Sequence, residues 1–519
     1  MHPGLSPRIL GEDYMDKVWL AVCAIFLLCL SFRTMDLGTG LTTDEILWID
    51  RAPSFIEAIL SHQWDQTYKV PHPGVVTMWL SGISIKIFDG SGFPEKLSFA
   101  RAPTVMVTSL SIILIFYFIR VLFNTKIALL SATLIALDPF LLAHSRLIHL
   151  DAMLTTFMLL CLLSLMSFLK KKRKEFLILT GIFLGLAILT KMPAIFLLAF
   201  MPFVVFFLSN DTMAKSFNYV IVIIILAAMT FFLFWPAMWV SPIDTLMKMA
   251  FDQQSGLDIV VKNPHGSGFF LGRIDDGSHG PLFYPVSFLM METPITLLFL
   301  PIFLVMFIKK LFKNGLDYVN KNLIALCLYI ILFAAQMILS LKAFPRYILP
   351  VFPVVDIIVA IGMYCFFRVH INKKSVFYLL MSGIILVHLV LIIPISPYFL
   401  SYTNPVVFGG PSNAPNMILM GWGEGNDLAA NYLNQKPDAQ NLTVAVDYYG
   451  FDQYFIGKTT SLNESVDFIG GVDYIVFYIS ALQRNWSMAA WDYYKTKEPE
   501  MVIELNGIDY CYIYKTSKQ

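Results

Sequence analysis

The sequence predicts a mainly α-helical membrane protein, with about eleven transmembrane helices in one bundle and a small exterior α/β domain after them. Three observations predict this class. Hydrophobic residues make up 57% of the 519 residues and charged residues only 14%, which is not typical of a water-soluble domain. Long apolar runs recur from residue 18 to residue 394, and a polar segment with strand-like runs follows. The formal net charge of +1 argues neither for nor against nucleic-acid binding, and no nucleic-acid partner is expected.

The apolar runs are interpreted as membrane spans because each approaches the roughly 20 residues that a spanning helix needs. They lie near residues 18–34, 103–123, 127–143, 152–169, 176–190, 193–208, 218–239, 286–308, 322–341, 347–367 and 376–394. No small-residue cleavage site follows the first run, so an uncleaved helix is expected there rather than a signal peptide.

The stretch 176–208 can be one long helix or two short ones interrupted at Lys191, Met192 and Pro193. Two helices put the clusters of Lys and Arg on one face of the membrane, as the positive-inside rule requires, whereas one helix would put the later clusters outside. The two-helix interpretation predicts a multi-pass protein of the plasma membrane with a cytoplasmic N-terminus and an exterior C-terminal region. Lys191 then lies in the outer half of a broken hairpin, and broken helices at membrane depth usually line a cavity.

This topology gives residues 1–395 as the transmembrane domain and 396–519 as the exterior domain. The outer loops are 35–102 and 240–285. Within the first of them, residues 75–88 are apolar but short, which favours a helix in the membrane interface at the rim of a cavity. In the exterior domain, strands are predicted at 443–447, 474–479, 501–505 and 510–514, and a helix at 427–434.

Ionisable residues gather on the outer face, where a charge at membrane depth costs about 3 kcal/mol and so indicates a polar site. Asp44 and Glu45 follow the first span and could take a proton from an acceptor hydroxyl; alternatively they are two solvated loop acids. Candidate phosphate-binding cations are Arg33, Arg101, Arg146, Lys191 and Arg346. Lys and Arg at helix ends also extend to lipid headgroups without a catalytic role. A functional role is favoured for Lys191 and Arg346, which stand against the positive-inside trend.

Metal binding is not indicated by the histidines, because His72, His149, His265 and His279 form no close-spaced ligand pair. No cofactor is expected, and a divalent metal is left open. The segment 421–425 (Gly-Trp-Gly-Glu-Gly) looks like a phosphate-cradling loop, but it lacks a preceding strand and the lysine of a P-loop. A tight turn that caps a helix is the favoured interpretation.

An ordered set of short motifs runs through the membrane part. It comprises Arg33, Asp44-Glu45, His72-Pro73, Arg101, Ser145-Arg146-Leu147, Leu150-Asp151-Ala152, Thr190-Lys191 and Arg346-Tyr347-Ile348-Leu349-Pro350, with a further segment from Gly280 to Pro294. In this order and these contexts the chain resembles the polyprenyl-phosphate-sugar-dependent glycosyltransferases of family 39, in the C-type membrane superfamily. Protein O-mannosyltransferases and the lipid A aminoarabinose transferase belong to that family.

The resemblance implies an inverting transferase that moves a sugar from a polyprenyl monophosphate carrier to a hydroxyl of a protein, glycan or lipid at the outer leaflet. By the same resemblance Asp44 is the general base and Glu45 orients the acceptor or a neighbouring cation. Lys191, Arg346 and Arg101 bind the leaving phosphate, with Arg33 and Arg146 as further candidates. Asp151, His72, His265 and Tyr347 support the site. The large exterior domain between the later helices of the O-mannosyltransferases has no counterpart here, so the acceptor stays open.

Two other classes of function remain. A transporter or flippase of a lipid-linked sugar would also use a cationic cavity, but it would be expected to show repeat symmetry, and the sequence has no fixed-period repeat. A noncatalytic subunit that binds glycans through residues 396–519 would tolerate replacement of Asp44.

Overall fold

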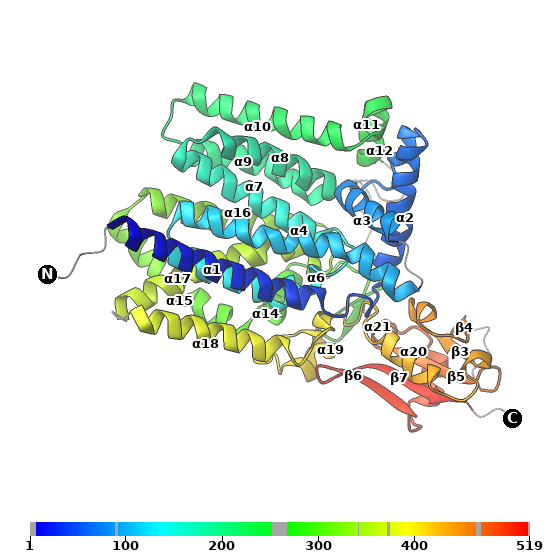
Figure 1. Cartoon of the computed structure of the whole chain (residues 1–519). Coiled ribbons are helices and arrows are strands. Elements are labelled where there is room, and N and C mark those ends of the chain that lie inside the picture. The colour runs from blue at the N-terminus through cyan, green and yellow to red at the C-terminus, as the bar shows by residue number, and fades with distance from the viewer. Residues whose placement is uncertain are drawn as a thin grey trace.

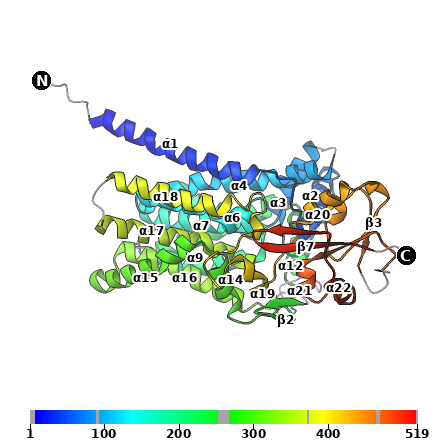
Figure 2. The same ribbon diagram turned by 90° about the horizontal axis from the view of Figure 1, so that it is seen from below.

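The computed structural model describes residues 7–88, 92–251, 267–340, 342–370, 374–462 and 469–516. Long helices lie side by side in one bundle, and a small sheet domain lies at one end of it (Figure 1). In the view turned by 90°, helix α1 begins at the end opposite the sheet domain (Figure 2). The predicted class, a helical membrane bundle followed by a small α/β domain, is confirmed.

The helices of the bundle follow the predicted apolar runs. They are α1 (Pro7–Thr34), α4 (Phe93–Leu122), α5 (Thr125–Leu137), α7 (Asp151–Lys171), α8 (Lys174–Thr190), α9 (Phe196–Leu208), α10 (Met213–Phe234), α15 (Pro294–Asn314), α16 (Tyr318–Ile338), α17 (Phe352–His370) and α18 (Lys374–Ile392). Seven of the described helices are long and apolar enough to cross a membrane, which makes the chain an integral membrane protein.

Capping residues and prolines divide the apolar runs. Helix α8 ends at Thr190, and a 3-10 turn at Met192–Ile195 leads into α9, so the prediction of two helices is confirmed. The predicted run 127–143 is also divided, because the Asp138 carboxylate accepts the Leu141 N–H at 2.6 Å and starts the short helix α6 (Pro139–His144). The run 286–308 is divided between α14 (Phe283–Met291) and α15, which the Thr293 hydroxyl caps.

The first outer loop forms two helices, α2 (Thr43–Leu60) and α3 (Val75–Ile87). Helix α2 lies across the end of the bundle that carries the sheet domain (Figure 1). Helix α3 packs closely on α2, since a Cβ on Gly82 would lie 2.4 Å from the carbonyl oxygen of Ala52. The apolar side chains of Ile87, at the end of α3, and of the adjacent Phe88 are exposed. This end of α3 agrees with the expected helix in the membrane interface.

The second outer loop contains α11 (Ala237–Val240), α12 (Pro242–Phe251) and the antiparallel hairpin of β1 (Gly268–Phe270) and β2 (Arg273–Asp275). The hairpin touches the chain that follows α18. The Leu271 N–H donates to the carbonyl oxygen of Met417, at the end of α19 (Ala414–Met417), at 2.8 Å. The second outer loop therefore contacts the segment that leads into the sheet domain.

The exterior sheet has the strand order β4-β3-β5-β7-β6. Its strands are β3 (Thr443–Val446), β4 (Lys458–Ser461), β5 (Tyr474–Tyr478), β6 (Met501–Leu505) and β7 (Ile508–Lys515), and its helices are α20 (Asn426–Asn434), α21 (Ile479–Gln483) and α22 (Met488–Tyr494). Strand β3 is parallel to β4 and β5, whereas β7 is antiparallel to β5 and β6. The predicted strands and helix are present, and β4 is an edge strand that the sequence did not predict.

The exterior domain is docked on the first outer loop by polar contacts. Asp427 accepts the Gly40 N–H at 3.1 Å and the Tyr398 hydroxyl at 2.7 Å. The Tyr454 hydroxyl donates to the carbonyl oxygen of Gly38 at 3.1 Å. These contacts fix the segment that leads into α2, where the acidic pair lies.

Candidate active site

A capping box at the start of α2 separates the two neighbouring acids. The backbone N–H and the hydroxyl of Thr42 both donate to Glu45 Oε2, at 3.0 and 3.1 Å. Glu45 is thereby turned inward and is fully buried, whereas 35% of the Asp44 side chain is exposed. Of this acidic pair, only Asp44 can contact a substrate.

Glu45 forms a buried ion pair with Arg101 from α4. Arg101 Nε donates to Oε1 at 2.7 Å and Nη2 to Oε2 at 2.6 Å. Its remaining N–H groups donate to the carbonyl oxygens of Leu37, Thr39 and Gly40. All five donors of the guanidinium are used, so Arg101 has none left for a phosphate. Glu45 orients a neighbouring cation, which is one of the two roles that the resemblance implies.

Asp44 faces two cationic groups. Its Oδ2 lies 3.1 Å from Arg346 Nη2 and 3.3 Å from His149 Nε2. Burial alone would raise the pKa of Asp44, but the hydrogen bond from His149 and the charges of Arg346, His149 and Lys191 hold it well below its ordinary value. Asp44 is therefore an ionised carboxylate at neutral pH and is free to accept a further hydrogen bond from its exposed side.

Asp151 joins the other charges from the first turn of α7. Its Oδ1 lies 2.6 Å from Lys191 Nζ, and its Oδ2 lies 3.0 Å from His149 Nδ1 and 3.5 Å from Arg346 Nε. The His149 ring thus lies between two carboxylates. Burial would lower the pKa of His149, but Asp151 and Asp44 together raise it. Asp151 is itself buried and holds the cations in place.

The exterior domain contributes Trp422 to this cluster. The guanidinium carbon of Arg346 lies 4.1 Å from the centre of the Trp422 ring and 4.3 Å from that of Phe344. The Trp422 ring also contacts His149 edge-on at 5.1 Å. Arg346 is therefore held between two aromatic faces, which fixes its guanidinium toward Asp44.

Lys191 and His72 lie on the other side of the cluster. Lys191 Nζ lies 4.6 Å from the centre of the Tyr347 ring. Burial, together with the charges of Lys191 and Arg51, lowers the pKa of His72 to about 3, so its ring is neutral. The next turn is bonded to the end of α8, because the Gly74 N–H donates to the carbonyl oxygen of Thr190 at 3.1 Å. This bond places the His72 loop beside Lys191.

Two predicted cations lie apart from this cluster. Arg33 is buried and donates to Cys29 Sγ at 2.6 Å and to the Ser109 hydroxyl at 3.4 Å. Arg146 donates to the carbonyl oxygens of Phe32, Met35 and Asp36 and stacks on Phe399. Both hold helix ends together, and neither reaches Asp44 in this structure. His265 lies outside the described residues.

Three residues of the site were missing from the predicted set. His149 lies close to Asp151 in the sequence, but its contact with Asp44 depends on the tertiary fold. Arg51 follows Asp44 by seven residues, a spacing that puts both on one face of a helix and could have revealed it. Trp422 gave no signal, because the sequence does not show that the exterior domain folds back over the bundle.

Within the described ranges, no group of three or more His, Cys, Asp or Glu side chains has an arrangement that could hold a metal ion. The carboxylates of Asp44 and Asp151 instead face Arg346, His149 and Lys191. A half-exposed carboxylate beside fixed cations can activate a hydroxyl on one side and hold an anion on the other.

Comparison with known proteins agrees with this fold. Residues 71–235 match the family described as dolichyl-phosphate-mannose-protein mannosyltransferase. No curated protein sequence matches the chain. The structure of ArnT from Cupriavidus metallidurans bound to undecaprenyl phosphate is similar, with a TM-score of 0.50 and 13% identity over 95% of this chain and 97% of that one. AglB from Archaeoglobus fulgidus gives a TM-score of 0.49 and 13% identity over 92% of this chain and 71% of that one.

The likeness to ArnT concerns the fold, and the family match covers the segment that contains His149, Asp151 and Lys191. The resemblance predicted from the ordered motifs is confirmed. Residues 71–235, about a third of the chain, match the mannosyltransferase family, and the whole chain is similar in fold to ArnT.

Proposed function

We propose that the enzyme transfers a sugar from a polyprenyl-phosphate carrier to a hydroxyl of a protein, glycan or lipid, with inversion at the anomeric carbon and Asp44 as general base. The acceptor oxygen attacks the anomeric carbon while Asp44 takes its proton. The bond from that carbon to the phosphate oxygen breaks, and polyprenyl phosphate leaves with the electron pair.

The observation that carries this proposal is the accessibility of Asp44. Its side chain is 35% exposed, compared with 3% for Asp151 and none for Glu45. A general base must come within hydrogen-bond distance of the proton that it takes. Of the three acids implied at this site, only Asp44 meets that requirement.

Lys191, Arg346 and Arg51 are the proposed ligands of the leaving phosphate. Lys191 and Arg346 flank Asp151 at 2.6 and 3.5 Å, and Arg51 lies on the same helix as Asp44. Within the described part of the chain Arg51 has no ion-pair partner and stacks only on Trp48, at 5.3 Å. The compared ArnT structure is bound to undecaprenyl phosphate, which supports a lipid phosphate as the anion.

The reaction is proposed to take place at the outer face of the plasma membrane, with a cytoplasmic N-terminus. Lys170, Lys215 and Arg368 lie at helix ends opposite the exterior domain, as the positive-inside rule requires for cytoplasmic residues. No catalytic metal is proposed, because the carboxylates of the site already face cations of the protein.

The experiment uses the purified full chain in proteoliposomes, a short polyprenyl-phosphate donor with a labelled sugar, and crude membrane extract as the acceptor. Release of polyprenyl phosphate is measured together with the anomeric configuration of the product by NMR. We expect release coupled to formation of an inverted linkage. Movement of intact donor across the membrane without release would instead establish the transporter. Retention of configuration would exclude direct attack of the acceptor on the anomeric carbon with Asp44 as the base.

A further inference from the structure

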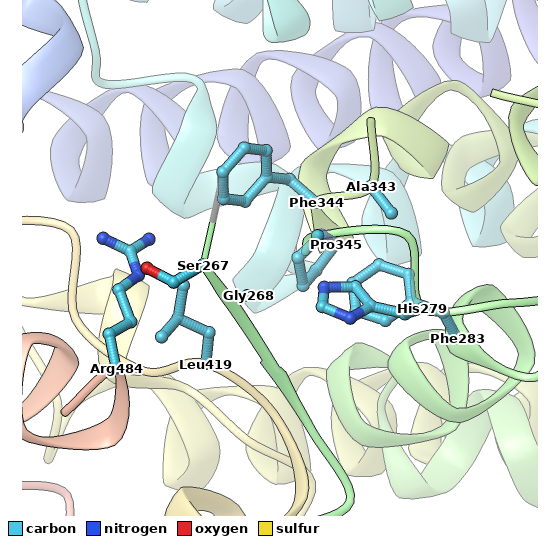
Figure 3. Close-up of a pocket in the computed structure, with 10 residues that line it drawn as sticks. Ser267, Gly268, His279, Phe283, Ala343, Phe344, Pro345, Leu419 and Arg484 are labelled. Atoms are coloured by element: carbon cyan, nitrogen blue, oxygen red, sulfur yellow. The ribbon is translucent and has the colours of Figure 1, made fainter. Parts of the chain in front are cut away.

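A small recess that opens to solvent lies beside the charged cluster, between the outer hairpin and the exterior domain. Its walls come from three parts of the chain: the segment around β1, the residues just before Arg346, and the exterior domain (Figure 3). Phe344 lines the recess and also lies against the Arg346 guanidinium, at 4.3 Å. One aromatic ring therefore separates the recess from the direct partner of Asp44.

The exterior wall of the recess carries Arg484. Its Nε is buried and has no hydrogen-bond partner, and its guanidinium stacks on Trp486 at 4.9 Å. No carboxylate among the described residues pairs with Arg484. Burial, and to a smaller extent the charge of Arg346, lowers the pKa of Arg484. A buried guanidinium donor without an acceptor favours binding of an oxyanion, which would satisfy the N–H group and balance the two like charges.

The opposite wall carries His279, which is held in one orientation. Its Nδ1 lies 2.6 Å from Asp275 Oδ2, and its ring stacks on Phe283 at 4.5 Å. The backbone of Gly268 packs directly against the His279 ring, because a Cβ at residue 268 would lie 2.4 Å from His279 Cε1. The second ring nitrogen has no partner among the described residues and is available to a hydroxyl.

The position of the recess distinguishes it from the proposed donor site. A donor with a polyprenyl tail must approach from the membrane, on the side of Lys191 and α8. The recess is instead lined by Leu419 and Arg484 of the exterior domain and by the β1–β2 hairpin. Aromatic rings together with a few fixed polar groups are typical of small-ligand sites.

We propose that this recess is the part of the acceptor subsite that holds an oxyanion carried by a saccharide, with Arg484 binding the anion and His279 an adjacent hydroxyl. This inference rests on the proposed transfer function, because it supplies the acceptor for Asp44. The oxyanion is a carboxylate or a phosphate, since a guanidinium fork fits both.

The test measures ligand binding by saturation-transfer difference NMR on the full chain in nanodiscs, without donor. The probes are methyl β-glucuronide, glucose 6-phosphate and methyl β-glucoside, which share a ring and differ in charge. At least one charged probe is expected to bind about tenfold more tightly than the neutral one. Arg484→Gln is expected to remove this difference, and Arg484→Lys to keep part of it. Arg273→Gln, which removes a nearby exposed charge outside the recess, is expected to leave it unchanged.

Equal binding of the charged and neutral probes, or a preference that survives in Arg484→Gln, would overturn the proposal. Displacement of the charged probe by polyprenyl phosphate would also overturn it, since the recess would then belong to the donor site. The binding test involves no sugar transfer, so its result is independent of the proposed function, which the separate transfer assay tests. Loss of transfer in an enzyme that still discriminates the probes would count against the proposed function alone.

Discussion

Asp44 and Glu45 show how strongly the environment decides the role of a carboxylate. Glu45 accepts from Arg101, from Thr42 and from the Ile148 N–H at 2.9 Å, which leaves it no contact with solvent. Asp44 keeps an exposed side and two cationic neighbours. Sequence alone predicted both acids at the site but could not divide the roles, because the division depends on contacts with residues 56 and 103 positions away.

His149→Gln tests the residue between the two carboxylates. Because the pKa of His149 is raised above 6.5, its protonated form stabilises the fold fully below about pH 6.5, and this contribution is lost as the pH rises through the raised pKa. The variant should be destabilised by about 3 kcal/mol at pH 6, and by clearly less at pH 9. Thermal unfolding of the detergent-solubilised protein at both pH values measures this.

The exposed His62 supplies the control for that experiment. His62→Asn should shift the unfolding midpoint little, and equally, at pH 6 and pH 9, because His62 is exposed and its ring contacts Trp64 edge-on. An equal loss of stability for His149→Gln at both pH values would show that the imidazole acts by its shape and not by its charge.

The proposed phosphate ligands were only partly predictable from the sequence. Lys191 and Arg346 were favoured because they stand against the charge bias of the membrane, and the structure brings both to Asp151. Arg101 and Arg146 have the same sequence signal, an arginine at the outer end of a helix. Their guanidinium groups are instead used to hold loop carbonyls, a role that depends on chain paths the sequence does not reveal.

At the scale of elements, the 421–425 loop connects the exterior domain to the site. The carbonyl oxygen of Trp422 accepts the Thr43 N–H at 3.1 Å, one residue before Asp44. Gly425 is the N-cap of α20, as expected for a tight turn that caps a helix. The loop therefore places the Trp422 ring on Arg346 and at the same time supports the start of α2.

Gly423→Ala should disrupt this element. Gly423 has φ +132°, and a Cβ there would lie 2.0 Å from the carbonyl oxygen of Leu41. Backbone strain and overpacking together should cost about 3 kcal/mol. The midpoint of thermal unfolding and the rate of sugar transfer should both fall. Gly507→Ala is the matched control, since it has φ +73° in the same domain but nothing within 4 Å. Equal effects of the two changes would show that the contact with Leu41 is not required.

Elements with strong periodic signals were predicted well, and the others were not. Strand β4 has no apolar alternation, because it is an edge strand with partly exposed residues, and the sequence therefore gave no reason to expect it. The break between α14 and α15 falls inside an apolar run. Its signal is the cap Thr293 followed by Pro294, which marks a helix start.

At the scale of the whole molecule, the bundle and the exterior domain share one hydrophobic core. Buried residues from α1, α2 and α4 form a continuous cluster with Phe451, Tyr478 and Tyr510 of the sheet domain. The sequence predicted both parts from the change in composition near residue 396. It could not predict that the exterior domain completes the site, because their contact joins residues nearly four hundred positions apart.

The central claim is that Asp44 acts as the base and the cations bind the leaving phosphate, and one paired measurement tests it most directly. Sugar transfer and equilibrium binding of a short polyprenyl phosphate are measured for the wild type, Asp44→Asn and Lys191→Met. Asp44→Asn should transfer at least about 100-fold more slowly. It should bind polyprenyl phosphate at least as tightly as the wild type, because Arg346 then loses its contact with the Asp44 carboxylate and keeps only the longer one with Asp151.

Lys191→Met should bind the lipid phosphate about tenfold more weakly, because it loses a charge-assisted contact. This pattern would separate base from phosphate ligand within one site. Transfer by Asp44→Asn at the wild-type rate would contradict the account, as would a loss of lipid phosphate binding in Asp44→Asn equal to that in Lys191→Met.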